Sequence, residues 1–429
     1  METQHNTLPR EIWIDIMRFL TFVPYETDLS SSAHIRLRFR KKPLHLDARL
    51  PCVYKDKYTI CRTLSAVSKC WSELIAAFFY SFLFIRHADD LQTLMRLFAG
   101  KPHFRRYVKG LIFTPNLHST KSQITLPAQQ WSQFPSLTVL HRWGEQPIFE
   151  GVYPGTLAVL DVVLYSMNNW DVPSTTFSTL TNLRHLTLVF QWRRPLIPSL
   201  SMPIELPALI GLDISDVRNP EIVLELAEWK MPKLRVLSID GGLPSSTLTS
   251  FISSVAPTIT ALQLKLRNYP PIKRVSTSIP LPHLELLTLN IREPYRTQTI
   301  EDVLATCQPL PNLRSIGVAQ SSRGMIRDRN SLSATLNMLC SVMERWKGAP
   351  KLSEIRIWEN HQKQLDSLLD PVSTYRSIRN RAFHPEVLRR NIRFKVVAPS
   401  GKYLDAVEAF EEVDAMFQEE EEGCTSIDR

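Results

Sequence analysis

The sequence predicts an α/β protein in which a small N-terminal helical module precedes a solenoid of stacked parallel strands. Three observations predict this fold class. The pattern L-x-x-L-x-L, with conservative substitutions, recurs about every 25 residues through the middle of the chain. A proline stands two residues before most copies of the pattern. Two apolar stripes at helical spacing lie within the first 90 residues.

The predicted N-terminal module, residues 1–90, contains two helical segments. Residues 8–20 read LPREIWIDIMRFL, with Pro9 and Glu11 where the first turn of a helix favours proline and acidic residues. The apolar residues of this segment share one face: Ile12, Ile16, Phe19 and Leu20. A second stripe at helical spacing follows within residues 60–85: Leu64, Val67, Trp71, Leu74 and Ile75. The basic insert between them, about residues 24–59, is expected to form a mobile loop.

The repeats are predicted over residues 100–360. The clearest copies of the pattern begin at Leu183, Leu209, Leu234, Ile259 and Leu284. Looser copies begin at Val108, Leu157, Leu313 and Leu352, and a partial copy begins at Leu137. Proline precedes seven of the ten copies by two residues, which fits a chain that turns at proline and then runs extended. The fourth and sixth positions then point into a shared core, and the third, fifth and seventh point outward.

Amphipathic helices are predicted between the strands, at Pro220–Trp229, Ser245–Val255, Thr299–Cys307 and Ser331–Trp346. These strand-and-helix units resemble the leucine-rich repeats over about residues 104–360. The resemblance implies a horseshoe with parallel strands on its concave face. The repeats are degenerate, because the Asn or Cys that the family places beyond the third apolar position is replaced by other residues: Gln191, Val217, Gly242, Arg267 and Arg292.

The N-terminal segments resemble the F-box, through Leu-Pro-x-Glu-Ile at residues 8–12 and Leu-x-x-Val-x-x-Cys-Trp-x-x-Leu at residues 64–74. A long break between the two halves is familiar from fungal-type F-box proteins. The resemblance implies a substrate receptor of an SCF ubiquitin ligase, which docks on a Skp-type adaptor and through it on a cullin. The residues that would bind the adaptor are Leu8, Pro9, Ile12, Ile16, Leu64, Val67, Trp71 and Leu74.

Recognition of a target protein for ubiquitination is expected on the outward positions of the strands. These positions hold His185, Asp213, Asp240, Gln263, Lys265, Asn290, Arg356 and Trp358, with Arg267 and Arg292 just beyond the strands. Because exposed Trp and Arg are enriched in binding hot spots, Arg267, Arg292 and Trp358 are the target-binding candidates. An alternative function is a leucine-rich-repeat scaffold or binding protein that recruits no ligase.

The sequence argues against enzyme chemistry and against cofactors. It contains no G-x-G-x-x-G, no G-x-x-x-x-G-K-[ST], no H-E-x-x-H and no G-x-S-x-G motif, so no catalytic residue is predicted. The six cysteines form no C-x-x-C pair and the eleven histidines are dispersed, so no metal site is predicted. We therefore expect a protein that acts through protein–protein interaction and is not an enzyme.

Charge and hydropathy predict a soluble, intracellular protein, cytoplasmic or nuclear. No secretory signal opens the chain, and the longest apolar run, Leu74–Ile85, is too short to cross a membrane. The net charge of +9 combines a basic body of +18 with an acidic tail of −9 at residues 404–429. Solvated Lys and Arg explain the basic body better than nucleic acid does. Residues 361–429 are expected to cap the repeats, through a helix bearing Leu404, Val407, Phe410, Val413 and Phe417.

Overall fold

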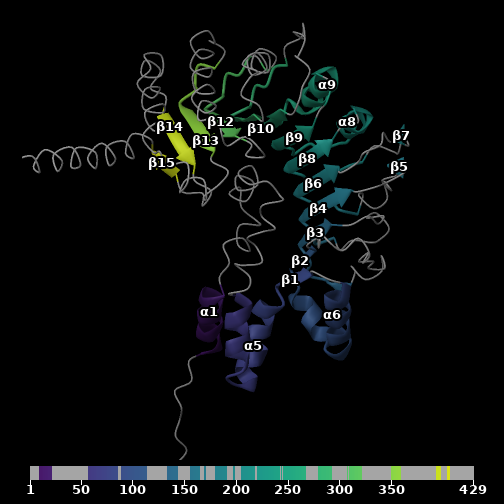
Figure 1. Cartoon of the computed structure of the whole chain (residues 1–429), viewed down its shortest axis with the longest axis vertical. Helices are drawn as coiled ribbons and strands as arrows, with labels where there is room; N and C mark the ends of the chain where they lie inside the picture. Colours follow the sequence, from purple (N-terminus) through teal and green to yellow (C-terminus); the bar gives the residue numbers. More distant parts are fainter. Residues whose placement is uncertain are drawn as a thin grey trace, which may run out of the picture. The chain divides into compact units, whose positions relative to one another are not determined.

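The computed structural model shows an α/β fold built on a largely parallel sheet. It describes residues 9–21, 57–85, 88–113, 133–143, 155–164, 169–170, 179–190, 197–198, 204–217, 220–241, 243, 245–266, 279–291, 307, 309–320, 349–358, 393–397 and 403–405. The chain divides into two compact units. The first comprises Met1–Leu212 and Trp229–Lys233, and the second comprises Asp213–Glu228 and Leu234–Arg429. Figure 1 labels the helices and strands.

The first unit begins with a helical module, as predicted. Helix α1 (Arg10–Leu20) starts after Pro9, and both the backbone N–H and the hydroxyl of Thr21 donate to the Met17 carbonyl at its end. A second helix covers residues 57–65. Helix α5 (Lys69–Phe79) is capped by Ser68, whose hydroxyl accepts from the Trp71 N–H at 3.2 Å.

The predicted stripe from Leu64 to Ile75 lies on helical residues 57–65, the following turn and α5, but the segment 60–85 does not end as a helix. Its last residues form strand β1 (Phe82–Ile85), which pairs in parallel with β2 (Gly110–Phe113). The Ser81 carbonyl accepts from the N–H groups of Lys109 and Gly110, at 2.8 and 2.9 Å, so the chain leaves α5 by joining the sheet. Helix α6 (Ala88–Gly100) and the 3-10 helix η2 (Pro102–Tyr107) connect β1 to β2.

The sheet contains 13 strands in chain order, with β1 and β15 at its edges. Every described pairing is parallel except that of β14 with β15. Strands β5 (Asn169–Trp170) and β7 (Ile197–Pro198) form a separate pair. The remaining strands are β3 (Val139–Trp143), β4 (Val159–Leu164), β6 (His185–Phe190), β8 (Gly211–Val217), β9 (Val236–Gly241), β10 (Ala261–Leu266), β11 (Leu286–Ile291), β12 (Ser315–Gln320), β13 (Glu354–Trp358), β14 (Arg393–Val397) and β15 (Tyr403–Asp405).

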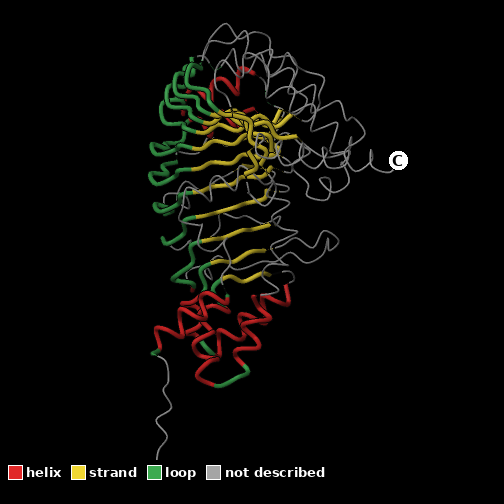
Figure 2. Tube along the Cα trace, turned by 90° about the vertical axis from the view of Figure 1, so that its left-hand side faces the viewer, coloured by secondary structure: helices red, strands yellow, loops and turns green. Residues whose placement is uncertain are grey.

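A tight turn precedes the strands where proline was predicted to bend the chain. At Leu206-Pro207-Ala208-Leu209, the Leu209 N–H donates to the Leu206 carbonyl at 3.2 Å. Proline stands at the second position of this turn, which its fixed φ suits best. The same bond recurs before β3, β11, β12 and β13, each with proline at that position, and before β6, where Thr181 takes its place. Within each unit, these turns follow one another along one edge of the strands (Figure 2). The first residue of each turn adds a buried position that the sequence pattern did not include: Phe134, Leu180, Leu206, Leu281, Leu310 and Ala349.

The inward face of the sheet is the core, as predicted. The first apolar position is buried in all ten copies, from Val108 to Leu352. The fourth position forms one in-register column across the strands, and its residues in the second unit include Leu237, Leu262, Leu287 and Ile316. Stacked parallel strands therefore bury a continuous apolar column that no single repeat could bury alone.

Two predicted helices lie in the second unit. Helix α9 (Ser245–Val255) has the predicted bounds, and α8 (Pro220–Ala227) ends two residues before the predicted end at Trp229. The two helices lie side by side (Figure 1). The predicted helix at Ser331–Trp346, and the one at Thr299–Cys307 apart from Cys307 itself, lie outside the described residues.

The sheet continues beyond residue 360, where we expected the repeats to end. Strand β14 pairs in parallel with β13, and β15 then turns back antiparallel to β14. Leu404 lies in β15, so the predicted C-terminal helix does not begin at Leu404. The rest of that prediction, from residue 406 onward, lies outside the described residues.

Candidate partner-docking surfaces

The helical module has a small core of its own. Met17 of α1, Cys61 and Ile75 of α5 are buried together. The Trp13 and Trp71 rings pack at 4.9 Å between centroids, and Leu64 packs on the same core. Leu64 and Trp71, two of the predicted adaptor-binding residues, therefore also hold the helices of the module together.

Helix α1 has a second apolar face that is largely exposed. Ile12 is 44% exposed, Phe19 83% and Leu20 43%, while Ile16 on the same face is half-buried. Trp13 and Met17 point the other way, into the module core. An amphipathic helix of a stable monomer normally has one apolar stripe, so α1 exposes more apolar surface than is usual for such a helix. We call Ile12, Ile16, Phe19 and Leu20 the α1 docking face.

Exposed apolar side chains gather on this module. Among the described residues, the exposed large hydrophobic side chains are Ile12, Phe19, Leu20, Val67 and Leu224. Val67, 61% exposed, precedes α5 in the same module, and only Leu224 lies elsewhere, on α8. Four of the five thus lie in the helical module, and two of these, Ile12 and Val67, are among the predicted adaptor-binding residues.

The other predicted adaptor-binding residues have mixed environments. Pro9 is exposed at the start of α1, and its carbonyl accepts from the Ile12 and Trp13 N–H groups at 3.0 and 3.2 Å. Leu74 is half-buried on α5. Leu8 lies outside the described residues. Phe19 was not among the predicted adaptor-binding residues, although its seven-residue spacing from Ile12 could have identified it.

The outward face of the sheet is apolar at its first strands. Phe82, Ile112, Val139 and Val159 form a buried cluster there, and Tyr58 packs against it. The Tyr58 hydroxyl also donates to the Phe82 carbonyl at 2.5 Å. Helical residues 57–65 thus attach the module to the outward side of β1, which removes that area as a docking surface.

A glycine makes room for this packing. A Cβ atom built on Gly110 would lie 2.3 Å from Cδ1 of the Phe82 ring, far inside van der Waals contact. The Phe82 ring therefore lies over the Gly110 backbone of the neighbouring strand. Two residues further along β3 and β4, the outward positions become polar. There, His141 Nδ1 pairs with Asp161 Oδ2 at 2.5 Å.

The outward face in the second unit is polar. Gln263 of β10 is in register with Ser238 of β9 and Thr288 of β11, and all three side chains are buried. The hydroxyl oxygens of Ser238, Thr288 and Ser315 have no hydrogen-bond partner, a state that costs free energy. We call Ser238, Gln263 and Thr288 the outward polar row; Ser315 of β12 lies outside it, in register with Leu286.

The expected accessibility of several outward residues was wrong. His185, Asp240 and Gln263 were predicted to face partners, but all three are buried. Neighbouring strands lie about 4.8 Å apart, so side chains in the middle of a parallel stack are flanked on both sides. Outward direction therefore does not imply exposure in this sheet.

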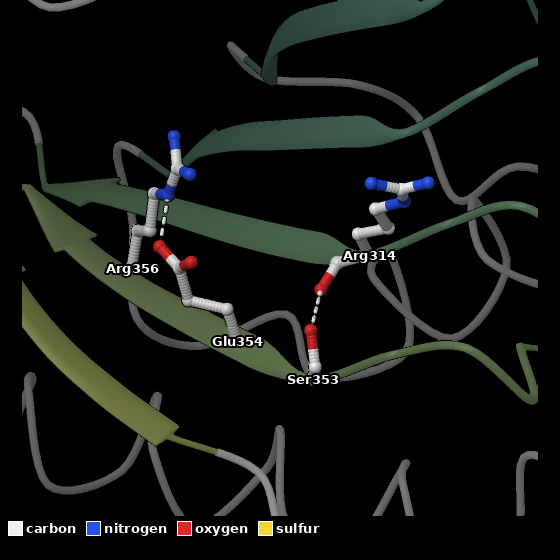
Figure 3. Close-up of polar contacts among 4 residues, drawn as sticks. All are labelled: Arg314, Ser353, Glu354 and Arg356. Carbon is white, nitrogen blue, oxygen red and sulfur yellow. Dashed lines mark hydrogen bonds and ion pairs between the residues drawn. The ribbon is translucent and has the colours of Figure 1, made fainter.

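A polar pair lies on strand β13 of the second unit. Arg356 Nε pairs with Glu354 Oε1 two residues away on the same strand, and both side chains are mostly buried (Figure 3). The Ser353 hydroxyl donates to the Arg314 carbonyl at 3.4 Å, where β12 and β13 begin (Figure 3). The charge of Arg356 is thus already compensated within the strand.

The three target-binding candidates remain predictions. Trp358 belongs to β13, where its backbone is in register with Ala319 and Val397. Its side chain is outside the described part of the structure, as are Arg267 and Arg292.

Neither a metal centre nor a membrane span is found in the described part of the chain. There, no group of three or more His, Cys, Asp or Glu side chains could hold a metal ion. None of the helices described is both long and apolar enough to cross a bilayer. No family model matches this chain, and no curated protein matches it.

Proposed function

We propose that this chain is a substrate receptor of a Skp-cullin-F-box ubiquitin ligase, with an F-box in its helical module and leucine-rich repeats in its sheet. The α1 docking face is the observation that supports this proposal most directly. Ile12, Ile16 and Phe19 follow the spacing with which a helix fills an apolar groove on a partner. The function is to hold a target near a conjugating enzyme and raise the effective concentration of its lysines.

The fold agrees with a receptor that performs no chemistry itself. Parallel strands in chain order make a long recognition sheet, and tight turns precede β3, β6, β8, β11, β12 and β13. The outward face of the first strands is occupied by the module, which leaves the strands of the second unit for a target. Target recognition through Arg267, Arg292 and Trp358 is part of the proposal.

Adaptor binding is tested with alanine variants of the full-length chain. Leu20→Ala and Phe19→Ala should each weaken binding to a Skp-type adaptor by about 30-fold, the loss of an interface hot spot. Circular dichroism and melting temperature should stay unchanged, because both side chains are exposed in the free chain. Isothermal titration calorimetry measures the affinities.

Leu224→Ala is the matched control, since Leu224 on α8 has the same 43% exposure as Leu20. It should leave adaptor affinity unchanged. Equal affinity of the Leu20, Phe19 and Leu224 variants would rule out docking through α1 and favour a repeat protein that recruits no ligase.

Target binding is tested after the adaptor has been uncoupled. Proximity labelling with the Phe19→Ala, Leu20→Ala double variant should enrich targets that are no longer degraded. Replacing Arg267, Arg292 and Trp358 together by Ala should weaken capture of those targets by about tenfold or more. Retention of every target by the triple variant would place recognition elsewhere on the chain.

A further inference from the structure

The segment between α6 and β2 is a compact basic surface. Residues 101–109 read KPHFRRYVK, with four Lys or Arg residues and no acidic residue. The middle of this segment is η2 (Pro102–Tyr107). A 3-10 helix has three residues per turn, so His103 and Arg106 lie on the same side, and Lys109 follows three residues later. All three are exposed.

Aromatic rings hold the cations in place. The Arg106 guanidinium lies 5.0 Å from the centre of the Tyr107 ring, and its Nη2 donates to the Tyr107 hydroxyl at 2.9 Å. Lys101 Nζ lies 5.3 Å from the centre of the Phe104 ring. Phe104 in turn stacks on Tyr80 at 4.9 Å, which anchors η2 against the end of α5. Lys101 and Arg106 are therefore positioned without a carboxylate, and their charges stay available.

No acid within the described part of the chain neutralises this surface. None of Lys101, Arg105, Arg106 and Lys109 makes an ion pair with a described carboxylate. Burial raises the pKa of Tyr80, so this phenol under the surface stays neutral and adds no negative charge.

Arg105 has an unsatisfied donor. Its Nε is buried and has no hydrogen-bond partner, an unfavourable state for part of a charged group. A carboxylate or phosphate approaching a guanidinium side-on accepts from Nε and one Nη together. Because Nε is buried in the free chain, an acidic partner would supply this acceptor only if the Arg105 side chain turned outward on binding.

We propose that η2 and Lys109 form a docking surface for an extended acidic segment of another protein. Successive turns of a 3-10 helix rise about 6 Å, and alternate side chains of an extended strand are about 6.6 Å apart, so two acidic groups of such a strand can lie beside His103 and Arg106. This surface lies apart from the α1 docking face in sequence and goes beyond the proposed function, because it needs neither adaptor nor cullin.

The rings favour a protein partner over nucleic acid. Single-stranded nucleic acid binds through bases that stack on open aromatic faces. Here Phe104 lies between Tyr80 and Lys101, and Tyr107 is covered by Arg106. Four cations also fall short of the roughly six to ten phosphate contacts of typical duplex binding.

The test is fluorescence anisotropy with the full-length chain and a labelled peptide that has glutamate at alternate positions. A second peptide with phosphoserine in place of glutamate distinguishes carboxylate from phosphate as the preferred group, and a glutamine peptide is the uncharged control. The double variant Arg106→Glu, Lys109→Glu should bind the preferred acidic peptide about tenfold or more weakly. Lys233→Glu, which reverses an exposed charge in a turn outside this surface, should not change the affinity.

Arg105→Lys distinguishes a side-on hydrogen-bonded contact with the guanidinium from attraction by its charge alone. It keeps the charge and removes the Nε donor, so affinity should fall if the side-on contact forms. Adaptor binding should persist in every variant, because none changes the α1 docking face. Unchanged peptide affinity in the double charge reversal, or tighter binding of a single-stranded oligonucleotide than of either acidic peptide, would overturn the proposal. Wild-type affinity of Arg105→Lys would overturn the role of Arg105.

Discussion

The outward face of the sheet differs between its first strands and the strands of the second unit, although the inward face is the same in both. Inward, Leu83 and Leu111 at one end and Leu262 and Leu287 at the other are all buried. Outward, the first strands present the buried cluster around Phe82, whereas the second unit presents the outward polar row. The inward residues are thus dictated by stacking, and the outward residues by what each region contacts.

The comparison explains how one repeating scaffold can serve two purposes. Apolar outward residues bury surface against helical residues 57–65 and attach the module. Polar outward residues contribute little to packing, and the unpartnered hydroxyls among them are unfavourable in the free chain. Such residues stabilise a region only when a further group supplies their hydrogen bonds.

The largest expected effect is at Phe82, whose outward side chain should behave as a core residue. Phe82→Ala should reduce the free energy of unfolding by about 3–5 kcal/mol, because it removes a buried ring and leaves a cavity. Urea denaturation measures the loss. A loss below about 1 kcal/mol would show that the outward face of β1 is not part of the core and would remove the contrast between the two regions.

Gly110 should show the next largest effect. Gly110→Ala should destabilise the protein by about 1–3 kcal/mol, since the new Cβ would displace the Phe82 ring. Combined with Phe82→Ala, the same change should cost much less than it does alone, because the clash is gone. Additive costs in this double-mutant cycle would contradict the packing of Phe82 over Gly110.

At Thr288, in the outward polar row, a substitution should have the opposite effect on stability. Thr288→Val should stabilise the protein by about 1 kcal/mol, because it removes a buried hydroxyl that has no hydrogen-bond partner and keeps the side-chain shape. Ser254, whose hydroxyl donates to the Phe251 carbonyl at 2.8 Å, provides the control, and Ser254→Ala should not stabilise. Destabilisation by Thr288→Val would mean that this hydroxyl is satisfied in solution.

The smallest expected effect is the pH dependence of stability that arises from the buried thiol of Cys307 in the second unit. Burial raises the pKa of the Cys307 thiol to about 12. The folded state therefore keeps its proton where the unfolded chain loses it, and stability falls as pH rises from about 9 toward 12. Between about pH 8 and pH 9.5 the loss from this group should be about 1 kcal/mol, and Cys307→Ala should lack it. Identical pH profiles for both proteins would contradict a desolvated thiol.

The inward face could be predicted residue by residue, because leucine spacing and strand alternation determine burial through local geometry. Strand β1 could not, since the apolar run Leu74–Ile85 suits a helix and a buried strand equally. Its extended form depends on Ser81 pairing with Lys109 and on Tyr58 packing against Phe82, contacts between residues distant in sequence.

The candidate docking surfaces were predictable only in part. The apolar face with Ile12 and Phe19 was visible in the sequence, but its exposure depends on which face of α1 meets the module core, and Trp13 meeting Trp71 decides that. The burial of Gln263 and Asp240 depends on neighbours contributed by adjacent strands. The basic residues 101–109 were visible as charge, but the three-residue turn that aligns His103 with Arg106 was not.

The chain order of the strands has a consequence for how the protein is made. Because each strand pairs with one that precedes it by only one repeat, most long-range contacts in the sheet close short loops. During synthesis, each new strand can pair with the preceding strand, which has already folded, and does not depend on a segment that is made much later. The strands can then pair one after another from the N-terminus onward, beginning with β1 and the helical module. A premature stop codon would release a shorter stack with an open last strand, prone to pairing with other chains.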